Sequence, residues 1–209
     1  HAQSHVNPPL ISKCSAPKPE KETSLYKAFE KRNREFIGTA LTIRNETAEP
    51  QIVAQDFNSV TPENAMKWES TEPSRNNVTF AGGDAVVVFA KKYDTEIHCH
   101  TLVWHSQLPT WVSGGGFDNK TLISIMENHI KNVAGRWKGA CTRWDVVNEA
   151  LNEDGTYRKS VFLDTIGEAY IPIAFRLAAK YAEGSKLYYN DYNLGYNGAK
   201  TEVAKRSVK

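Results

Sequence analysis

The stretch that decides the fold is Arg143-Trp144-Asp145-Val146-Val147-Asn148-Glu149-Ala150. Its apolar residues predict a short β-strand that ends in an amide and a carboxylate. Because alternate side chains of a strand point to opposite faces, Trp144 and Asn148 are expected on the face opposite to Glu149. Glutamate is rarely fully buried, and the carboxyl ends of parallel strands commonly carry the chemistry of α/β proteins. The stretch therefore predicts a functional site, with a plain exit into a solvated loop as the alternative.

Strands and helices are predicted to alternate along the whole chain. Apolar and β-branched runs predict strands at 36–40, 57–61, 96–103, 144–148 and 187–190. Helical spacing predicts helices between them, beginning at 25, 52, 84, 119 and 171. Strands that alternate with helices imply βαβ units and a parallel sheet. The sequence is therefore predicted to adopt an α/β fold.

The clearest helical pattern follows residue 118. Its apolar stripe has three- and four-residue steps and consists of Leu122, Ile125, Met126, His129, Ile130 and Val133. Asn119 or Thr121 is predicted to cap this helix, and Asp84 is predicted to cap the helix before it.

The first residues differ from the rest in composition. Residues 1–22 contain four of the nine prolines, Pro8, Pro9, Pro17 and Pro19. We expect an N-terminal arm or linker there, without a core of its own. Residues 23–209 are then predicted to form the folded domain.

Charge and hydropathy exclude some classes of partner. The 26 Lys and Arg residues nearly balance 24 Asp and Glu residues, which leaves a net charge of +2. No basic stripe is present, so we expect no nucleic-acid partner. No run of 18 apolar residues occurs, so we expect no membrane span. Aromatic residues make up 11% of the chain, with five tryptophans, which suits either a large core or stacking on sugar rings.

The cysteines are Cys14, Cys99 and Cys141, and none has a partner at metal-site or redox-motif spacing. An odd count leaves at least one free thiol or one absent partner. Cys99 and Cys141 lie in β-like apolar stretches, so the simplest prediction for both is a buried free thiol.

Sequence motifs for N-glycosylation begin at Asn45, Asn77 and Asn119. Each is an Asn-x-Thr sequon in a polar, loop-like segment, as is typical of glycosylated proteins that pass through the secretory pathway. The chain begins at His1 without the apolar core of a signal peptide, so we expect any such signal to have been removed.

Three further blocks follow predicted strands. They are Thr61-Pro62-Glu63-Asn64-Ala65-Met66-Lys67-Trp68-Glu69, then His98-Cys99-His100-Thr101-Leu102-Val103-Trp104-His105-Ser106-Gln107-Leu108-Pro109, and Leu187-Tyr188-Tyr189-Asn190-Asp191-Tyr192-Asn193. Together with Trp144 to Glu149, these blocks resemble the family 10 glycoside hydrolases, the retaining endo-β-1,4-xylanases, and especially the fungal ones. The resemblance runs from about Tyr26 to the last residue. Four blocks in the right order are far more specific than one short motif.

The resemblance implies the (β/α)₈ fold of a TIM barrel, which typically takes about 250 residues. This chain has 209 residues, and the first 22 are predicted to be an arm. We therefore expect an incomplete barrel of about five βα units. Residues 23–209 would be a glycoside hydrolase catalytic domain truncated at its carboxyl terminus.

Two glutamates do the chemistry in the resembling family. The resemblance places the acid/base at Glu149, on the fourth strand. The nucleophile belongs to a seventh strand, in a motif of the type Thr-Glu-Leu/Phe-Asp-Ile, and the sequence contains no such motif. Thr201-Glu202 lies in a helix-like stretch shortly after the fifth strand and is not expected to replace it. Retention needs only the two carboxylates, so we expect no cofactor.

Two of the histidines are considered as metal ligands. His98 and His100 have a spacing that can serve a metal, but no cysteine or carboxylate cluster supplies further ligands, so no metal is expected. His98 and His105 are predicted to be satisfied core residues.

The resemblance also implies sugar-binding residues. Glu63, Asn64 and Lys67 match the Glu-Asn-x-x-Lys motif that binds a sugar on the glycone side, although a solvated helix start explains Glu63 and Lys67 equally well. Asn190 and Tyr192 end the fifth strand, where Tyr192 would stack on a sugar beyond the cleaved bond or, alternatively, belong to the core.

Residues around the sugar just before the scissile bond are implied as well. His100 would contact a hydroxyl, Trp104 would be a stacking platform and Gln107 would complete the group. Asn148 would donate to the 2-hydroxyl, where a hydrogen bond that strengthens in the transition state helps most; a turn residue that ends the strand is the alternative.

The predicted function is therefore that of a secreted, extracellular endo-1,4-β-xylanase. Its partners would be xylan and xylo-oligosaccharides, and the sequence does not predict an oligomeric state. The alternative is an inactive truncated protein or a non-catalytic xylan-binding protein, because the seventh-strand glutamate has no counterpart in this sequence. A third alternative is a cellulase-like specificity on the same scaffold, which would depend on small changes in the glycone pocket.

Overall fold

A parallel β-sheet forms the centre of the molecule, and its strands follow one another in chain order. The computed structural model describes residues 24–44 and 49–207; the predicted arm, Cys14 and the sequon at Asn45 lie outside them. Within these residues the strands are β1 (Gly38–Leu41), β2 (Ser59–Pro62), β3 (Glu96–Trp104), β4 (Cys141–Asn148) and β5 (Lys186–Asn190). Each neighbouring pair is parallel. The predicted α/β fold is confirmed.

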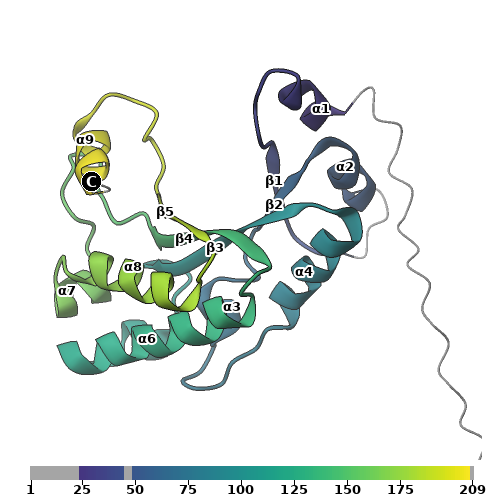
Figure 1. Cartoon of the computed structure of the whole chain (residues 1–209). Helices are drawn as coiled ribbons and strands as arrows, with labels where there is room; N and C mark the ends of the chain where they lie inside the picture. The colour runs from purple at the N-terminus through teal and green to yellow at the C-terminus, as the bar shows by residue number, and fades with distance from the viewer. Residues whose placement is uncertain (1–23, 45–48, 208–209) are drawn as a thin grey trace, which may run out of the picture.

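Helices connect the strands, and the longest of them lie along one face of the sheet (Figure 1). They are α1 (Leu25–Glu30), α2 (Glu49–Asp56), α3 (Trp68–Thr71), α4 (Ala81–Tyr93), α5 (Thr110–Ser113), α6 (Asn119–Arg136), α7 (Val161–Ile166), α8 (Tyr170–Tyr181) and α9 (Ala199–Ser207). The long helices α6 and α8 pack side by side against β3 and β4. None of the helices in the described part of the chain is long and apolar enough to cross a membrane.

Helix α6 buries the stripe that its spacing predicted, from Leu122 to Val133. Its cap, however, is Asp118, whose Oδ1 accepts a hydrogen bond from the backbone N–H of Thr121 at 2.7 Å. The predicted caps Asn119 and Thr121 were wrong because the residue that precedes the first helical turn is the one whose side chain reaches the free N–H groups.

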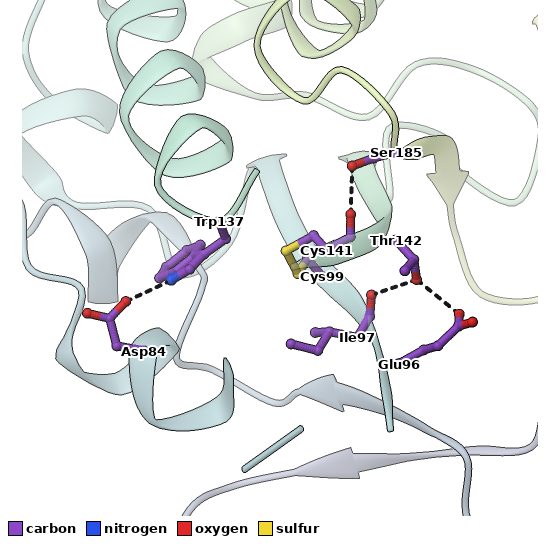
Figure 2. Close-up of a disulfide and its surroundings, with 8 residues drawn as sticks. All are labelled: Asp84, Glu96, Ile97, Cys99, Trp137, Cys141, Thr142 and Ser185. Carbon is purple, nitrogen blue, oxygen red and sulfur yellow. Dashed lines mark hydrogen bonds between the residues drawn. A yellow bond between two sulfur atoms is a disulfide. The ribbon is translucent and has the colours of Figure 1, made fainter. Parts of the chain in front are cut away.

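Asp84 is also misassigned by the sequence pattern. It lies inside the first turn of α4, which begins three residues earlier at Ala81. Its Oδ1 accepts a hydrogen bond from Arg136 Nε at 3.1 Å. It also accepts one from Trp137 Nε1 at 2.9 Å (Figure 2). Asp84 therefore ties α4 to the end of α6, which local sequence could not reveal.

A disulfide joins Cys99 of β3 to Cys141 at the start of β4 (Figure 2). Cys141 is the register partner of Ile97, and Cys99 lies two residues further along β3 on the same face. The Cα atoms are 5.7 Å apart, within the range that a disulfide spans. Both residues are buried, as expected. The prediction of free thiols was wrong for both, because their pairing depends on strand register rather than on spacing along the chain.

Removing the disulfide is expected to destabilise the fold. The bridged cysteines are 42 residues apart, and closing a loop of that length stabilises a protein by about 4 kcal/mol in the chain-entropy account. We expect a Cys99→Ala, Cys141→Ala variant to unfold at a clearly lower urea concentration than the parent chain. Dithiothreitol should lower the midpoint of the parent chain and leave that of the variant unchanged. Cys14→Ala is the control for loss of a thiol, and equal midpoints for all three proteins would contradict the expectation.

Candidate active site

The candidate site lies along the edge formed by the carboxyl ends of β2 to β5. Nine of the ten site residues predicted from the sequence are on this edge or in the loops that directly follow it: Glu63, Asn64, Lys67, Trp104, Gln107, Asn148, Glu149, Asn190 and Tyr192. The tenth, His100, lies within β3, four residues before its end at Trp104. Parallel strands place these residues at one end of the sheet although they are far apart in the sequence.

Glu149 follows β4 directly and has an unusual backbone. Its φ is +53°, in the left-handed region that non-glycine residues rarely adopt. Its N–H donates to the backbone oxygen of Asn190 at 2.8 Å, and its own backbone oxygen accepts from Arg158 Nε at 3.0 Å. Such a conformation costs about 1–3 kcal/mol and persists only where the surroundings impose it. The two bonds hold the Glu149 backbone from both sides.

The carboxylate of Glu149 is oriented by Trp104, whose Nε1 donates to Oε2 at 2.9 Å. One face of the Trp104 ring faces Lys67, with Nζ 4.8 Å from the ring centre. The indole thus lies between a cation and an acid.

Lys67 is buried and sits in a small polar cluster. Its Nζ donates to Asn64 Oδ1 at 2.9 Å and to Gln107 Oε1 at 2.6 Å, and Gln107 Nε2 donates to Asn64 Oδ1 at 3.0 Å. Burial lowers the pKa of Lys67, while the carboxylates of Glu63 and Glu149 oppose that shift without cancelling it. The cluster is therefore rigid and holds donors and acceptors beside Trp104.

The amides of Asn148 and Asn190 meet at the ends of neighbouring strands. The two residues are register partners, and their side chains are joined at 2.9 Å between Asn190 Nδ2 and Asn148 Oδ1. Asn148 is buried. On the other side of β4, the register partner of Asn148 is Trp104 of β3.

A buried carboxylate that sequence reasoning did not select lies on β4, before Asn148. Asp145 is 5% exposed, with Oδ1 at 2.8 Å from His98 Nε2 and Oδ2 at 2.8 Å from His100 Nδ1. Burial would raise the pKa of Asp145, but the hydrogen bonds and charges of the two imidazoles hold it below its usual value. His100 is thereby fixed beside Trp104, with ring centres 6.2 Å apart. His98 is partly exposed and pairs with Asp145, so it is not the core residue that was expected. The sequence signal that could have identified Asp145 is a charged residue within an apolar strand.

Tyr192 is 45% exposed, which excludes the alternative that it belongs to the core. Its hydroxyl oxygen lies 2.5 Å from Arg158 Nη2, and Lys200 Nζ lies 3.5 Å from the ring centre. Neither Arg158 nor Lys200 was selected from the sequence, because neither belongs to a motif or a periodic pattern.

Glu202, the other glutamate considered, is on α9 and is exposed, where it pairs with Lys205 at 3.0 Å.

The fold, with parallel strands in chain order and polar side chains at their carboxyl ends, is that of a barrel-type α/β protein. The chain belongs to glycosyl hydrolase family 10, whose family model matches residues 24–209. It is 68% identical over 192 residues to endo-1,4-beta-xylanase 2 of Aureobasidium pullulans, an alignment that covers 90% of this chain and 53% of that protein. It is 54% identical to endo-1,4-beta-xylanase A of Fusarium oxysporum, over 90% of this chain and 58% of that one.

Solved structures agree with the sequence comparison. The endo-1,4-beta-xylanase XylE of Penicillium canescens superposes with a TM-score of 0.86 at 36% identity, over 90% of this chain and 59% of the other. Xylanase 10B of Thermotoga petrophila, solved in complex with xylobiose, gives a TM-score of 0.86 at 37% identity over the same shares. The chain spans about half the length of the curated relatives it matches.

The Asp145 pair predicts a specific acid sensitivity. The pKa of Asp145 is lower in the folded state than its usual value of about 3.9, so its contribution to stability is complete above about pH 4 and is lost as the pH falls through the folded-state pKa. We expect Asp145→Asn to be less stable than the parent at pH 5 to 7, with a difference that shrinks below about pH 4. Urea unfolding at a series of pH values measures this difference. Exposed Glu69→Gln is the matched control, and a difference that stays constant down to about pH 2.5 would refute the assignment.

Proposed function

We propose that the chain is the acid/base-bearing part of a retaining endo-1,4-β-xylanase that hydrolyses internal bonds of xylan. The observation that carries this proposal is the geometry of Glu149: a carboxylate at the end of β4, with a fixed backbone and with Oε2 bound by Trp104 Nε1. A proton on this carboxyl group would pass to the leaving glycosidic oxygen, and the resulting carboxylate would later deprotonate water.

The second carboxylate would come from the remainder of a full-length family member. Retention needs a nucleophile about 5–5.5 Å from the acid, on the other face of the sugar. The sequence holds no Thr-Glu-Leu/Phe-Asp-Ile type motif that could supply it. This feature also favours the second candidate function, a xylan-binding protein without catalysis.

The proposed glycone side consists of Glu63, Asn64, Lys67 and Gln107, which offer hydroxyl partners, with Trp104 as a wall. His100, held by Asp145, would contact a hydroxyl of the sugar at the cleavage point, and Asn148, supported by Asn190, would donate to its 2-hydroxyl. A donor fixed in advance needs no reorganisation when charge develops in the transition state, so its electrostatic stabilisation is obtained in full.

Xylo-oligosaccharides are the proposed ligands because structural relatives carry them: the Thermotoga petrophila enzyme was solved with xylobiose, and another similar structure, of a mutant protein, was solved with xylotriose. Tyr192 would stack on the sugar on the leaving-group side. We also propose that the protein is secreted, since its polymeric substrate lies outside the cell and Asn77 is an exposed sequon residue.

The assay of the proposed function needs a second protein that supplies the second carboxylate. An apolar groove of about 770 Å³ runs along β5 and α8, lined by residues that include Leu151, Ile171, Phe175 and Leu187. A surface of this kind suits packing against further βα units. We therefore choose a joined enzyme, in which the chain continues into the carboxyl-terminal part of the Aureobasidium pullulans relative.

We expect the 209-residue chain alone to release no reducing ends from xylan, and the joined enzyme to be active. Glu149→Gln in the joined enzyme should lower kcat on xylan by about 10²–10⁴-fold, because proton donation to a poor leaving group is lost. Reducing-sugar release by the three proteins is the measurement. Robust turnover by the chain alone would show that a carboxylate within it, such as Glu202 or Asp191, is the nucleophile.

A further inference from the structure

Tyr192 has three polar contacts and is still partly exposed. Lys200 Nζ, only 3.5 Å from the ring centre, lies over one face of the ring, because an atom in the ring plane could not approach so closely. Arg158 donates to the phenol oxygen at 2.5 Å, and Asp191 Oδ1 accepts from the backbone N–H of Tyr192 at 2.9 Å. Nearly half of the residue is still exposed. The ring is therefore held in a fixed orientation and is still partly open to solvent.

Lys200 is unusual for a lysine because it is only 2% exposed. A buried ammonium is costly unless it is paired, and Lys200 Nζ lies 2.7 Å from Asp191 Oδ1 and 3.0 Å from Glu153 Oε1. Burial alone would lower the pKa of Lys200, but these two carboxylates outweigh burial and raise it. The ammonium under Tyr192 therefore stays charged at neutral pH.

The same group of residues reaches the candidate acid. Arg158, which bonds the Tyr192 phenol, also donates to the backbone oxygens of Glu149 at 3.0 Å and Leu151 at 3.2 Å. One side chain thus connects the ring to the backbone of Glu149. The loop after β4 and the loop after β5 are therefore connected through the hydrogen bonds of Arg158.

We propose that Lys200 and Arg158 are positioning residues that hold Tyr192 as a preset platform for the leaving-group sugar of a xylan chain. The proposal rests on the proposed function. A pyranose packs its apolar face on an aromatic ring, and a ring that is already ordered loses no rotamer freedom when the sugar binds. Without Lys200 the ring can turn away, and the platform must be rebuilt in each binding event.

Two substrates distinguish a positioning role of Lys200 from a general loss of folded enzyme. Xylopentaose places sugars on both sides of the cleaved bond and needs the platform. Xylobiosyl fluoride has the same glycone and releases fluoride, which has no ring to stack on Tyr192. Loss of the platform should therefore affect xylopentaose and spare the fluoride, whereas loss of fold should affect both.

The test is Lys200→Met in the joined enzyme. We expect kcat/KM on xylopentaose to fall about tenfold and kcat/KM on xylobiosyl fluoride to stay within about twofold. Lys200→Arg keeps the charge under the ring and should recover most of the loss. The matched control is Lys205→Met, which removes an exposed lysine of the same helix that is paired with Glu202 at 3.0 Å; it should change neither value.

A double-mutant cycle with Tyr192→Ala shows whether Lys200 acts through the ring. In that background Lys200→Met should have no further effect on xylopentaose, because the two residues then act as one unit. If Lys200→Met does not fold, Glu153→Gln removes an exposed partner of Lys200 instead, and a smaller loss confined to xylopentaose is expected.

Equal losses on both substrates, additive losses in the cycle, or no loss on xylopentaose from either variant would overturn the positioning role. These results would leave the proposed function standing. A parental joined enzyme that is inactive on both substrates would overturn the proposed function itself, and this inference with it.

Discussion

The register of β3, β4 and β5 is the constraint on which the site depends. Trp104, Asn148 and Asn190 are partners across these three strands, so one row of the sheet delivers an indole and two amides to the same edge. The β3–β4 pairing shifts between Ile97 and His98 and again between His100 and Val103. The β4–β5 pairing shifts between Asp145 and Val147. Without them, strict alternation would carry the row out of line, because one residue of slip turns every side chain to the other face. Glu149 follows the row directly and inherits its position from it.

The buried charged groups of Asp145, Lys67 and Lys200 below and beside this row each have polar partners, which explains how an edge rich in charge can sit on an apolar sheet. Asp145 is shared by two imidazoles, Lys67 is bound by Asn64 and Gln107, and Lys200 is bound by two carboxylates. In a medium of low dielectric a matched polar network is rigid, whereas an unmatched one is costly. The networks therefore give the site its stiffness rather than much net stability, since buried ion pairs roughly repay their own desolvation.

What the sequence could predict follows from the range of the interactions. Strands and the stripe of α6 were predictable because each depends on a period of a few residues. The edge residues were predictable because four motifs preserve a family pattern. The Cys99–Cys141 disulfide was not, because it depends on which residues the register shift brings together. Arg158 and Lys200 were not either: their partners Tyr192 and Glu153 lie 34 and 47 residues away, with no motif to connect them.

The acid side of the site obtains its geometry from contacts within the chain. Glu149 is fixed by Trp104 from β3, by Asn190 from β5 and by Arg158 from its own loop, so its left-handed backbone is imposed by three neighbouring segments. A strained residue persists only where the surroundings determine it more than once, and such residues concentrate where chemistry is done. The groove along β5 and α8 is the opposite case, an apolar surface whose partner is not among the described residues. The two observations differ in kind: contacts from β3, from β5 and from the loop after β4 are sufficient to orient Glu149, whereas the described residues leave the apolar groove along β5 and α8 open.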